Sequence, residues 1–241
     1  MGIFDKVEGI VKRQMVLFFI VDTSGSMVGT KIGAVNTAIR EVLPELNGIG
    51  GSDVDLKIAC LKFSSGCSWM HTSPVPVENF QWNNLSADGV TDFGAACKEL
   101  SDKMAKEKFL SAPSASVAPA IFLMSDGEPT DDYKKGLAEL QKNNWYKYAI
   151  KVAVAIGDDA NIDVLKEFTG NIEAVITVHT PEALKKMIRF VSITSSQIGS
   201  KSQPMYDGQI ESKQEAMIEQ IKDLQQTDPD LSQTSTAEDD W

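Results

Sequence analysis

The chain contains few of the residues that most often carry catalysis or cross-links. Among its 241 residues are 3 cysteines and 2 histidines. The odd cysteine count and the spacing of Cys60, Cys67 and Cys97 fit neither a disulfide framework nor a zinc motif. The N-terminal residues lack the pattern of a secretory signal peptide. We therefore expect a cytoplasmic protein with reduced cysteines.

Positive charge and long apolar stretches are also scarce. Residues 15–21 form an uninterrupted apolar stretch, but a membrane-spanning helix needs about 20 such residues. The formal net charge is −11, which argues against nucleic-acid binding because phosphate contacts require lysine and arginine. Residues 199–241 hold 10 acidic residues against 3 lysines, so the C-terminal part is the acidic part of the chain.

A group of polar side chains directly follows the apolar stretch 15–21. This stretch predicts a strand buried on both faces of a parallel sheet, and ligand sites lie beyond the carboxyl ends of such strands. The next residues, 22–26, supply the Asp22 carboxylate and the Ser24 and Ser26 hydroxyls. Oxygen ligands of this kind suit a hard divalent cation such as Mg²⁺. The alternative is an ordinary polar turn in which Asp22 caps the next helix.

Two later segments favour the metal site over the polar turn. Thr91 lies in the glycine-flanked segment 89–94, before a helical pattern. Asp126 follows the apolar stretch 120–124, which predicts a second buried strand. If the two strands are neighbours, Asp22 and Asp126 converge, with Thr91 from a third loop. We expect Asp92 to cap a helix, and Asp131 suits the N-cap of a helix over 133–143.

These residues resemble the metal-ion-dependent adhesion site (MIDAS) of the von Willebrand factor A (VWA) domain family. That site combines a D-x-S-x-S segment, a threonine from a second loop and an aspartate from a third. The resemblance covers residues 13–197 and implies five metal-site residues: Asp22, Ser24, Ser26, Thr91 and Asp126. The three hydroxyls are the expected direct ligands, while the two carboxylates bind either directly or through metal-bound water.

Hydrophobic periodicity along the rest of the chain predicts an α/β fold. Strands expected at 54–63, 74–77, 149–156 and 174–178 alternate with helical patterns, which indicates a doubly wound, mostly parallel central sheet with helices on both faces. The family resemblance adds one antiparallel edge strand to this VWA, Rossmann-like architecture. We expect an N-terminal segment 1–12, the VWA domain 13–197 and an acidic tail 198–241 with a helix over 209–226.

The predicted function is a non-enzymatic protein-interaction module. An Mg²⁺ ion, with Mn²⁺ and Ca²⁺ as alternatives, would bind an aspartate or glutamate presented by a partner protein. One alternative is an Mg²⁺-dependent phosphohydrolase or phosphotransferase that uses Asp22. Ser24 stands where an aspartyl-phosphatase needs a second aspartate, and Lys31 does not follow a Walker spacing. A second alternative is an adaptor that acts through its tail and retains a vestigial metal site.

The segment 125–131 is similar to that of bacterial cytoplasmic TerY-like VWA proteins. These belong to tellurite-resistance and stress-response clusters, some of them associated with phage defence. The resemblance implies, as partners, a kinase-like protein and a metal-dependent Ser/Thr protein phosphatase of the same cluster.

Overall fold

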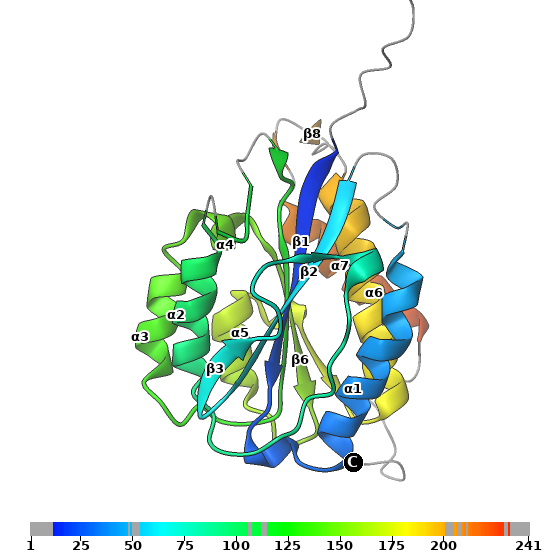
Figure 1. Cartoon of the computed structure of the whole chain (residues 1–241). Helices are drawn as coiled ribbons and strands as arrows, with labels where there is room; N and C mark the ends of the chain where they lie inside the picture. The colour runs from blue at the N-terminus through cyan, green and yellow to red at the C-terminus, as the bar shows by residue number, and fades with distance from the viewer. Residues whose placement is uncertain are drawn as a thin grey trace, which may run out of the picture.

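The first strand, β1 (Arg13–Asp22), is covered on both of its faces, as its apolar sequence predicts. The computed structural model in Figure 1 describes residues 12–47, 49, 54–105, 108–111, 115–199, 212–228 and 231, and the backbone of 200, 205–206 and 209–210. Alternate β1 side chains enter two separate apolar clusters, with Leu17 and Phe19 in one and Phe18 and Ile20 in the other.

In the described part of the chain the central sheet has seven strands, and β1 lies near its middle. The strand order is β3-β2-β1-β5-β6-β7, with β4 pairing β2 on the same side as β3. The pairs β1–β2, β1–β5, β5–β6 and β6–β7 are parallel. The remaining strands are β2 Val54–Ser64, β3 Gly66–Trp69, β4 Val75–Pro76, β5 Ala120–Ser125, β6 Ile150–Ile156 and β7 Val175–Val178. This confirms the predicted doubly wound, mostly parallel sheet.

Helices cover both faces of the sheet, as expected for a doubly wound fold (Figure 1). One face carries α1 (Thr30–Val42), α6 (Pro181–Ser200) and α7 (Lys213–Thr227). The other carries α2 Phe93–Lys103, α3 Tyr133–Leu140, α4 Asn144–Tyr148 and α5 Ile162–Thr169. Each layer buries its own apolar cluster against the sheet. Short 3-10 helices occur at η1 Gly25–Met27, η2 Leu43–Leu46, η3 Val77–Asn79 and η5 Ile172–Ala174.

Some elements differ from the sequence-based expectation. The edge next to β2 is formed by two antiparallel segments, the expected β4 and the unexpected β3. The expected helix 133–143 is interrupted, because α3 ends at Leu140 and the Asn143 side chain caps α4 by accepting hydrogen bonds from the N–H groups of Trp145 and Tyr146. Helix α6 continues past Val191 to Ser200. In this last part its buried residues include the polar Ser192, Ser195 and Ser196, so an apolar pattern did not indicate it.

Helix α7, within the expected acidic tail, packs on the body of the protein. Met217 and Ile221 are fully buried. The Gln214 side chain accepts from the backbone N–H of Lys151 and donates to its carbonyl, 2.7 Å and 2.9 Å away. These bonds provide partners for the backbone N–H and carbonyl of Lys151, which lies in β6 before Ala153, the residue at which pairing with β7 begins. The expected N-terminal segment lies, except for Lys12, outside the described residues, as do residues 232–241. The three-part division of the chain stays a prediction.

Candidate metal centre

Two of the five predicted site residues lie at the carboxyl ends of adjacent parallel strands. Asp22 ends β1, and Asp126 directly follows β5, which pairs with β1. β1 connects through α1 to β2 on one side, while β5 lies on its other side. The strand order therefore reverses between β1 and β5, which is where doubly wound sheets form ligand crevices.

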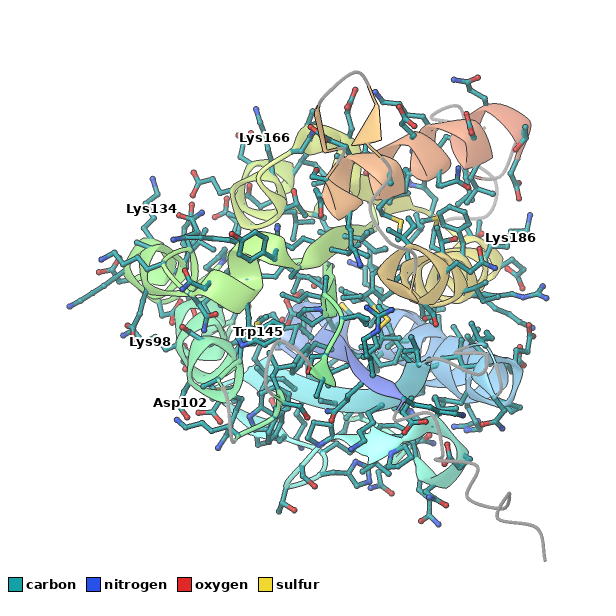
Figure 2. The ribbon with its side chains drawn as sticks, turned by 90° about the horizontal axis from the view of Figure 1, so that it is seen from above. Lys98, Asp102, Lys134, Trp145, Lys166 and Lys186 are labelled. Atoms are coloured by element: carbon teal, nitrogen blue, oxygen red, sulfur yellow. The ribbon has the colours of Figure 1, made fainter. Side chains whose placement is uncertain are left out.

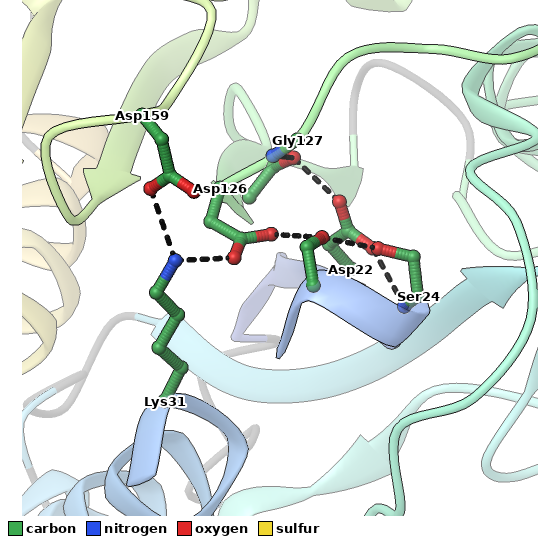
Figure 3. Close-up of polar contacts among 8 residues, drawn as sticks. Asp22, Ser24, Lys31, Asp126, Gly127 and Asp159 are labelled. Atoms are coloured by element: carbon green, nitrogen blue, oxygen red, sulfur yellow. Dashed lines mark hydrogen bonds and ion pairs between the residues drawn. The ribbon is translucent and has the colours of Figure 1, made fainter. Parts of the chain in front are cut away.

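A chain of hydrogen bonds links the first loop to the β5 loop (Figure 3). The Asp22 carboxylate accepts from the Ser24 N–H at 2.8 Å and from the Ser125 hydroxyl at 2.6 Å. The Ser24 and Ser26 hydroxyl oxygens are 3.0 Å apart. The Ser26 hydroxyl donates to Asp126 Oδ1 at 2.7 Å. Three hydroxyls and two carboxylates, counting Ser125, thus form one connected network.

Backbone contacts hold the Thr91 loop against the first loop. The Gly25 N–H donates to the Gly89 carbonyl at 3.0 Å. Gly89 has a φ of +84°, and a Cβ there would lie 2.4 Å from the Ser65 hydroxyl oxygen. A residue with a side chain fits neither this conformation nor this space. The Thr130 hydroxyl accepts from the Thr91 N–H at 3.0 Å, which ties this loop to the β5 loop as well.

Oxygens from the first loop and the Thr91 loop surround one point beside Gly127, which lies in the β5 loop. An ideal Cβ built on Gly127 would lie 3.2 Å from Ser26 Oγ, 3.6 Å from Thr91 Oγ1 and 3.8 Å from Asp22 Oδ2. A cavity of about 400 Å³ opens here, with Ser24, Ser26, Thr91, Asp126 and Gly127 among its lining residues. The structure therefore brings the predicted residues together, with Asp22 behind the wall that the other four form.

The donor set is rich in hydroxyls and poor in charge. Among the described residues, no three His, Cys, Asp or Glu side chains gather as a metal cluster. Asp22 is fully buried, and no lysine, arginine or histidine forms an ion pair with it in the described part of the chain. Burial raises the pKa of its carboxyl above the ordinary value, against the opposing effect of the Ser125 and Ser24 hydrogen bonds; the nearby Asp126 charge raises it further. A cation here would remove this penalty, so the donors fit a hard divalent ion.

The site also contains a cation of its own, which the sequence pattern did not reveal. Lys31, in the first turn of α1, donates from Nζ to Asp126 Oδ2 at 2.6 Å and to Asp159 Oδ1 at 3.1 Å (Figure 3). The Lys31 side chain is only 14% exposed, and that of Asp126 is completely buried. These attractions raise the pKa of Lys31 despite the opposing desolvation. The Asp126 carboxylate therefore already has a cationic partner, whereas the Asp22 carboxylate has none among the described residues.

The acids near the site have structural partners that differ from the expected ones. Asp92 occupies the N-cap position of α2, but its carboxylate accepts from the Gly66 N–H at 2.7 Å. Asp131 accepts from the first-turn N–H groups of Gly94 and Ala95, both at 2.9 Å. Asp131 thus caps α2 and not the helix that follows it in sequence. Asp92 therefore holds the expected N-cap position but does not cap through its side chain, whereas the expected capping of the helix after Asp131 was wrong.

His179 lies at the same sheet edge, directly after β7. Its Nδ1 is 3.0 Å from an Asp158 carboxylate oxygen, and Asp158 adjoins the Asp159 that contacts Lys31. The His179–Asp158 contact is therefore separate from the five predicted residues.

Comparison with known proteins agrees with this fold. The model of the von Willebrand factor type A domain family matches residues 17–190. No match was found among curated proteins. Three similar solved structures are a von Willebrand factor type A protein from Catenulispora acidiphila (TM-score 0.58, 19% identity), the ArnB paralog VWA2 from Sulfolobus acidocaldarius (0.52, 16%) and proximal thread matrix protein 1 from the mussel byssus, with a zinc-occupied MIDAS motif (0.56, 16%).

These alignments cover most of this chain but less than half of each relative. They include 76%, 74% and 79% of this chain, against 43%, 44% and 47% of the three structures in the same order. At these identities the similarity establishes the fold. In the described part of the chain, no helix is both long and apolar enough to cross a membrane.

Proposed function

Because the chain belongs to the von Willebrand factor type A domain family, we propose that its loop site is a MIDAS that binds a partner protein through a divalent cation. Domains of this family are typically interaction modules, and one similar structure carries a zinc-occupied MIDAS motif. The observation that carries the proposal is the convergence of Ser26, Thr91 and Asp22 oxygens, from two loops, on one point beside Gly127 at the beginning of the β5 loop.

Mg²⁺ is the ion that we propose, with Mn²⁺ and Ca²⁺ as alternatives. Ser24, Ser26 and Thr91 would supply neutral oxygens, and Asp22 and Asp126 would bind directly or hold metal-bound water. When bound, the ion supplies a positive centre with an exchangeable coordination position. The protein's own contribution is to hold the oxygens in place: Ser125 fixes Asp22, and Gly89 allows the Thr91 loop to approach.

The proposed ligand is an aspartate or glutamate side chain of another protein. Mostly neutral ligands leave the ion with positive charge that a carboxylate can neutralise. Exposed apolar side chains beside the site fit a protein surface better than a free small anion. Val90 lines the cavity and is 47% exposed, and Val28, at the end of η1, is 60% exposed. Both would add apolar contacts to the surface of the partner.

Partner capture tests this function directly. The immobilised full chain is incubated with extract of the host cell in Mg²⁺ or in EDTA, and retained proteins are identified by mass spectrometry. We expect a partner that is retained only in Mg²⁺ and that is lost with the Asp22→Asn/Ser24→Ala variant. Mutation of that partner's contacting acid to its amide should abolish binding. Capture that is equal in EDTA, or unaffected by the double substitution, would favour the tail-mediated adaptor and overturn the proposal.

The enzymatic alternative has less support. In the described part of the chain, both histidines have other contacts: the His71 ring packs against Phe80 with the ring planes tilted by 57°, and His179 contacts Asp158. A generic phosphoester assay in Mg²⁺ separates the two functions. We expect no turnover, whereas turnover that disappears in Asp22→Asn would establish a phosphohydrolase.

We also propose the narrower TerY-like setting, in a bacterial cytoplasmic stress-response or tellurite-resistance complex. Its support is the sequence of residues 125–131 and the three free cysteines, of which Cys60 and Cys97 are buried. A kinase-like protein or a metal-dependent Ser/Thr phosphatase among the Mg²⁺-dependent partners would support this setting. Partners confined to cell-surface proteins would contradict it.

A further inference from the structure

A second cavity, larger than the metal site, lies at the opposite edge of the sheet. Its volume is about 1100 Å³, and it lies between α4, the first turn of α7 and the beginnings of β1 and β6. Figure 2 views the molecule from this end and shows Trp145 near the middle of the face. Neither the sequence motifs nor the proposed metal-dependent binding uses this cavity.

The cavity gathers positive charge in a protein whose net charge is −11. Among the described residues that line it are four cations, Arg13, Lys147, Lys151 and Lys213, and one acid, Glu215. The Glu215 carboxylate is already occupied, because it accepts from the Ser212 N–H at 2.8 Å in the capping box of α7. Among the described contacts, Glu215 therefore forms no ion pair with Lys151 or Lys213.

Lys151 is the most unusual of these cations. It is only 8% exposed, and its Nζ donates to the backbone carbonyls of Tyr146 and Ala149 at 3.1 Å and 2.9 Å. Within the described residues no carboxylate forms an ion pair with it, although buried lysines are almost always paired. Burial lowers the pKa of Lys151 to about 8. An anion in the cavity would stabilise its charged form.

Lys213 is a second cation without a carboxylate partner in the described part of the chain. Its Nζ donates to the Gly199 carbonyl at 2.6 Å. Burial lowers the pKa of Lys213, and the charge of Arg13 lowers it further, so the two cations repel each other across this end of the molecule. An anionic ligand near Lys213 would offset such repulsion.

Uncharged hydrogen-bond donors line the same cavity. The Ser116 hydroxyl is buried, the residue being 8% exposed, and it has no hydrogen-bond partner among the described residues. The first turn of α7, a helix of 15 residues, also lines the cavity, and its N-terminal N–H groups favour anions. The double hydrogen bond from Gln214 to the Lys151 backbone holds this helix end in place.

We propose that this cavity binds a small phosphorylated molecule, with its phosphate near Lys151, Lys213 and the N-terminus of α7. Several cations and a helix N-terminus suit a multiply charged anion better than a single carboxylate. The volume accommodates a ligand larger than inorganic phosphate, and the aromatic residue Trp145 is among those that line the cavity. The site is independent of the proposed metal site, which lies at the other end of the strands.

Calorimetric titration of the full chain with pyrophosphate tests this proposal. EDTA is present throughout, so that a metal ion at the other site cannot contribute. We expect saturable binding that Lys213→Gln weakens about tenfold or more, because a charge-assisted hydrogen bond is lost. Lys222→Gln is the matched control: it removes the same charge from the same helix, at a residue that pairs with Glu173 instead. It should bind pyrophosphate as the wild type does.

Two further measurements keep the test decisive if Lys213→Gln proves unstable. Ser116→Ala should remain folded, since its hydroxyl has no described partner to lose, and should weaken pyrophosphate binding several-fold. Succinate, a dicarboxylate, should bind much more weakly than pyrophosphate. Absence of saturable binding, equal losses in Lys213→Gln and Lys222→Gln, or equal affinity for succinate would each overturn the proposal.

Discussion

Lys31 allows a direct test of the charge balance at the metal site, because its ammonium group competes with any bound cation for the Asp126 carboxylate. The Lys31 Nζ lies 2.6 Å from Asp126 Oδ2, and the side chain is only 14% exposed. Unit charges about 4 Å apart repel by about 1 kcal/mol in water and about 4 kcal/mol at an effective dielectric constant of about 20. A divalent ion beside Asp126 would feel twice this repulsion. Even the water-like limit therefore gives about 2 kcal/mol, or about 30-fold in affinity.

Lys31→Gln is accordingly expected to bind Mg²⁺ and Mn²⁺ at least about tenfold more tightly than the wild type in calorimetric titrations. The same substitution leaves the buried Asp126 unpaired when no metal is present. The free energy of unfolding in EDTA should therefore fall by about 2 kcal/mol, less than the about 3–5 kcal/mol for a fully buried pair. Addition of Mg²⁺ should restore the lost stability, because the ion binds only the folded site.

Lys185→Gln is the control for this experiment. Lys185 pairs with Glu41 on α1, so its loss changes the net charge equally without removing a cation from Asp126. An equal gain of metal affinity in Lys185→Gln would mean that net charge, not local competition, is responsible. Metal affinity that is unchanged or weaker in Lys31→Gln would refute the competition argument.

Three other substitutions test separate parts of the structure. The pKa of Lys151 is about 8 in the folded state and about 10.4 in the unfolded state, so the native state loses its proton first as the pH rises. Between about pH 7.5 and pH 10.5 the free energy of unfolding of the wild type should therefore rise by up to about 3 kcal/mol relative to that of Lys151→Met. A difference between the two proteins that does not change with pH in denaturant titrations would contradict this. Gly89→Ala should cost about 1–2 kcal/mol in thermal unfolding through its positive φ, with additional strain against Ser65, while wild-type stability would show that the loop adapts. Asn36→Ala should lower the free energy of unfolding by about 2–3 kcal/mol in chemical denaturation, because the buried Asn36 side chain accepts from the N–H of Leu85 and donates to its carbonyl, both at 2.8 Å. A loss below about 1 kcal/mol would indicate that water replaces these bonds.

The fold was predictable because its strands have unusually clear patterns. The apolar stretch before Asp22 and the stretch before Asp126 each predicted a buried strand, and both strands lie inside the sheet. Parallel strands connected by helices place their carboxyl ends at one edge. The meeting of the two aspartates then required only that β1 and β5 be neighbours, which the pairing confirms.

Other features depend on contacts that local sequence does not encode. Strand β3 has four residues, beginning with Gly66, and exists because it folds back on β2, so no periodicity indicated it. Asp131 caps α2 across 37 residues, whereas a cap is ordinarily sought directly before its own helix. The contacts of Lys31 with Asp126 and Asp159 span 95 and 128 residues. Each of these features follows from the assembled sheet edge, which is known only once the strands are placed.

Calorimetric titration of the folded wild-type chain with Mg²⁺ and Mn²⁺, beside the Asp22→Asn/Ser24→Ala variant, tests the central claim most directly. The expected result is saturable binding of one ion by the wild type, with affinity lost by about 100-fold or more in the variant, which lacks one buried carboxylate and one hydroxyl ligand. No uptake of either ion by the folded wild type, or equal uptake by the variant, would contradict the assignment of this loop site as a metal-dependent binding centre.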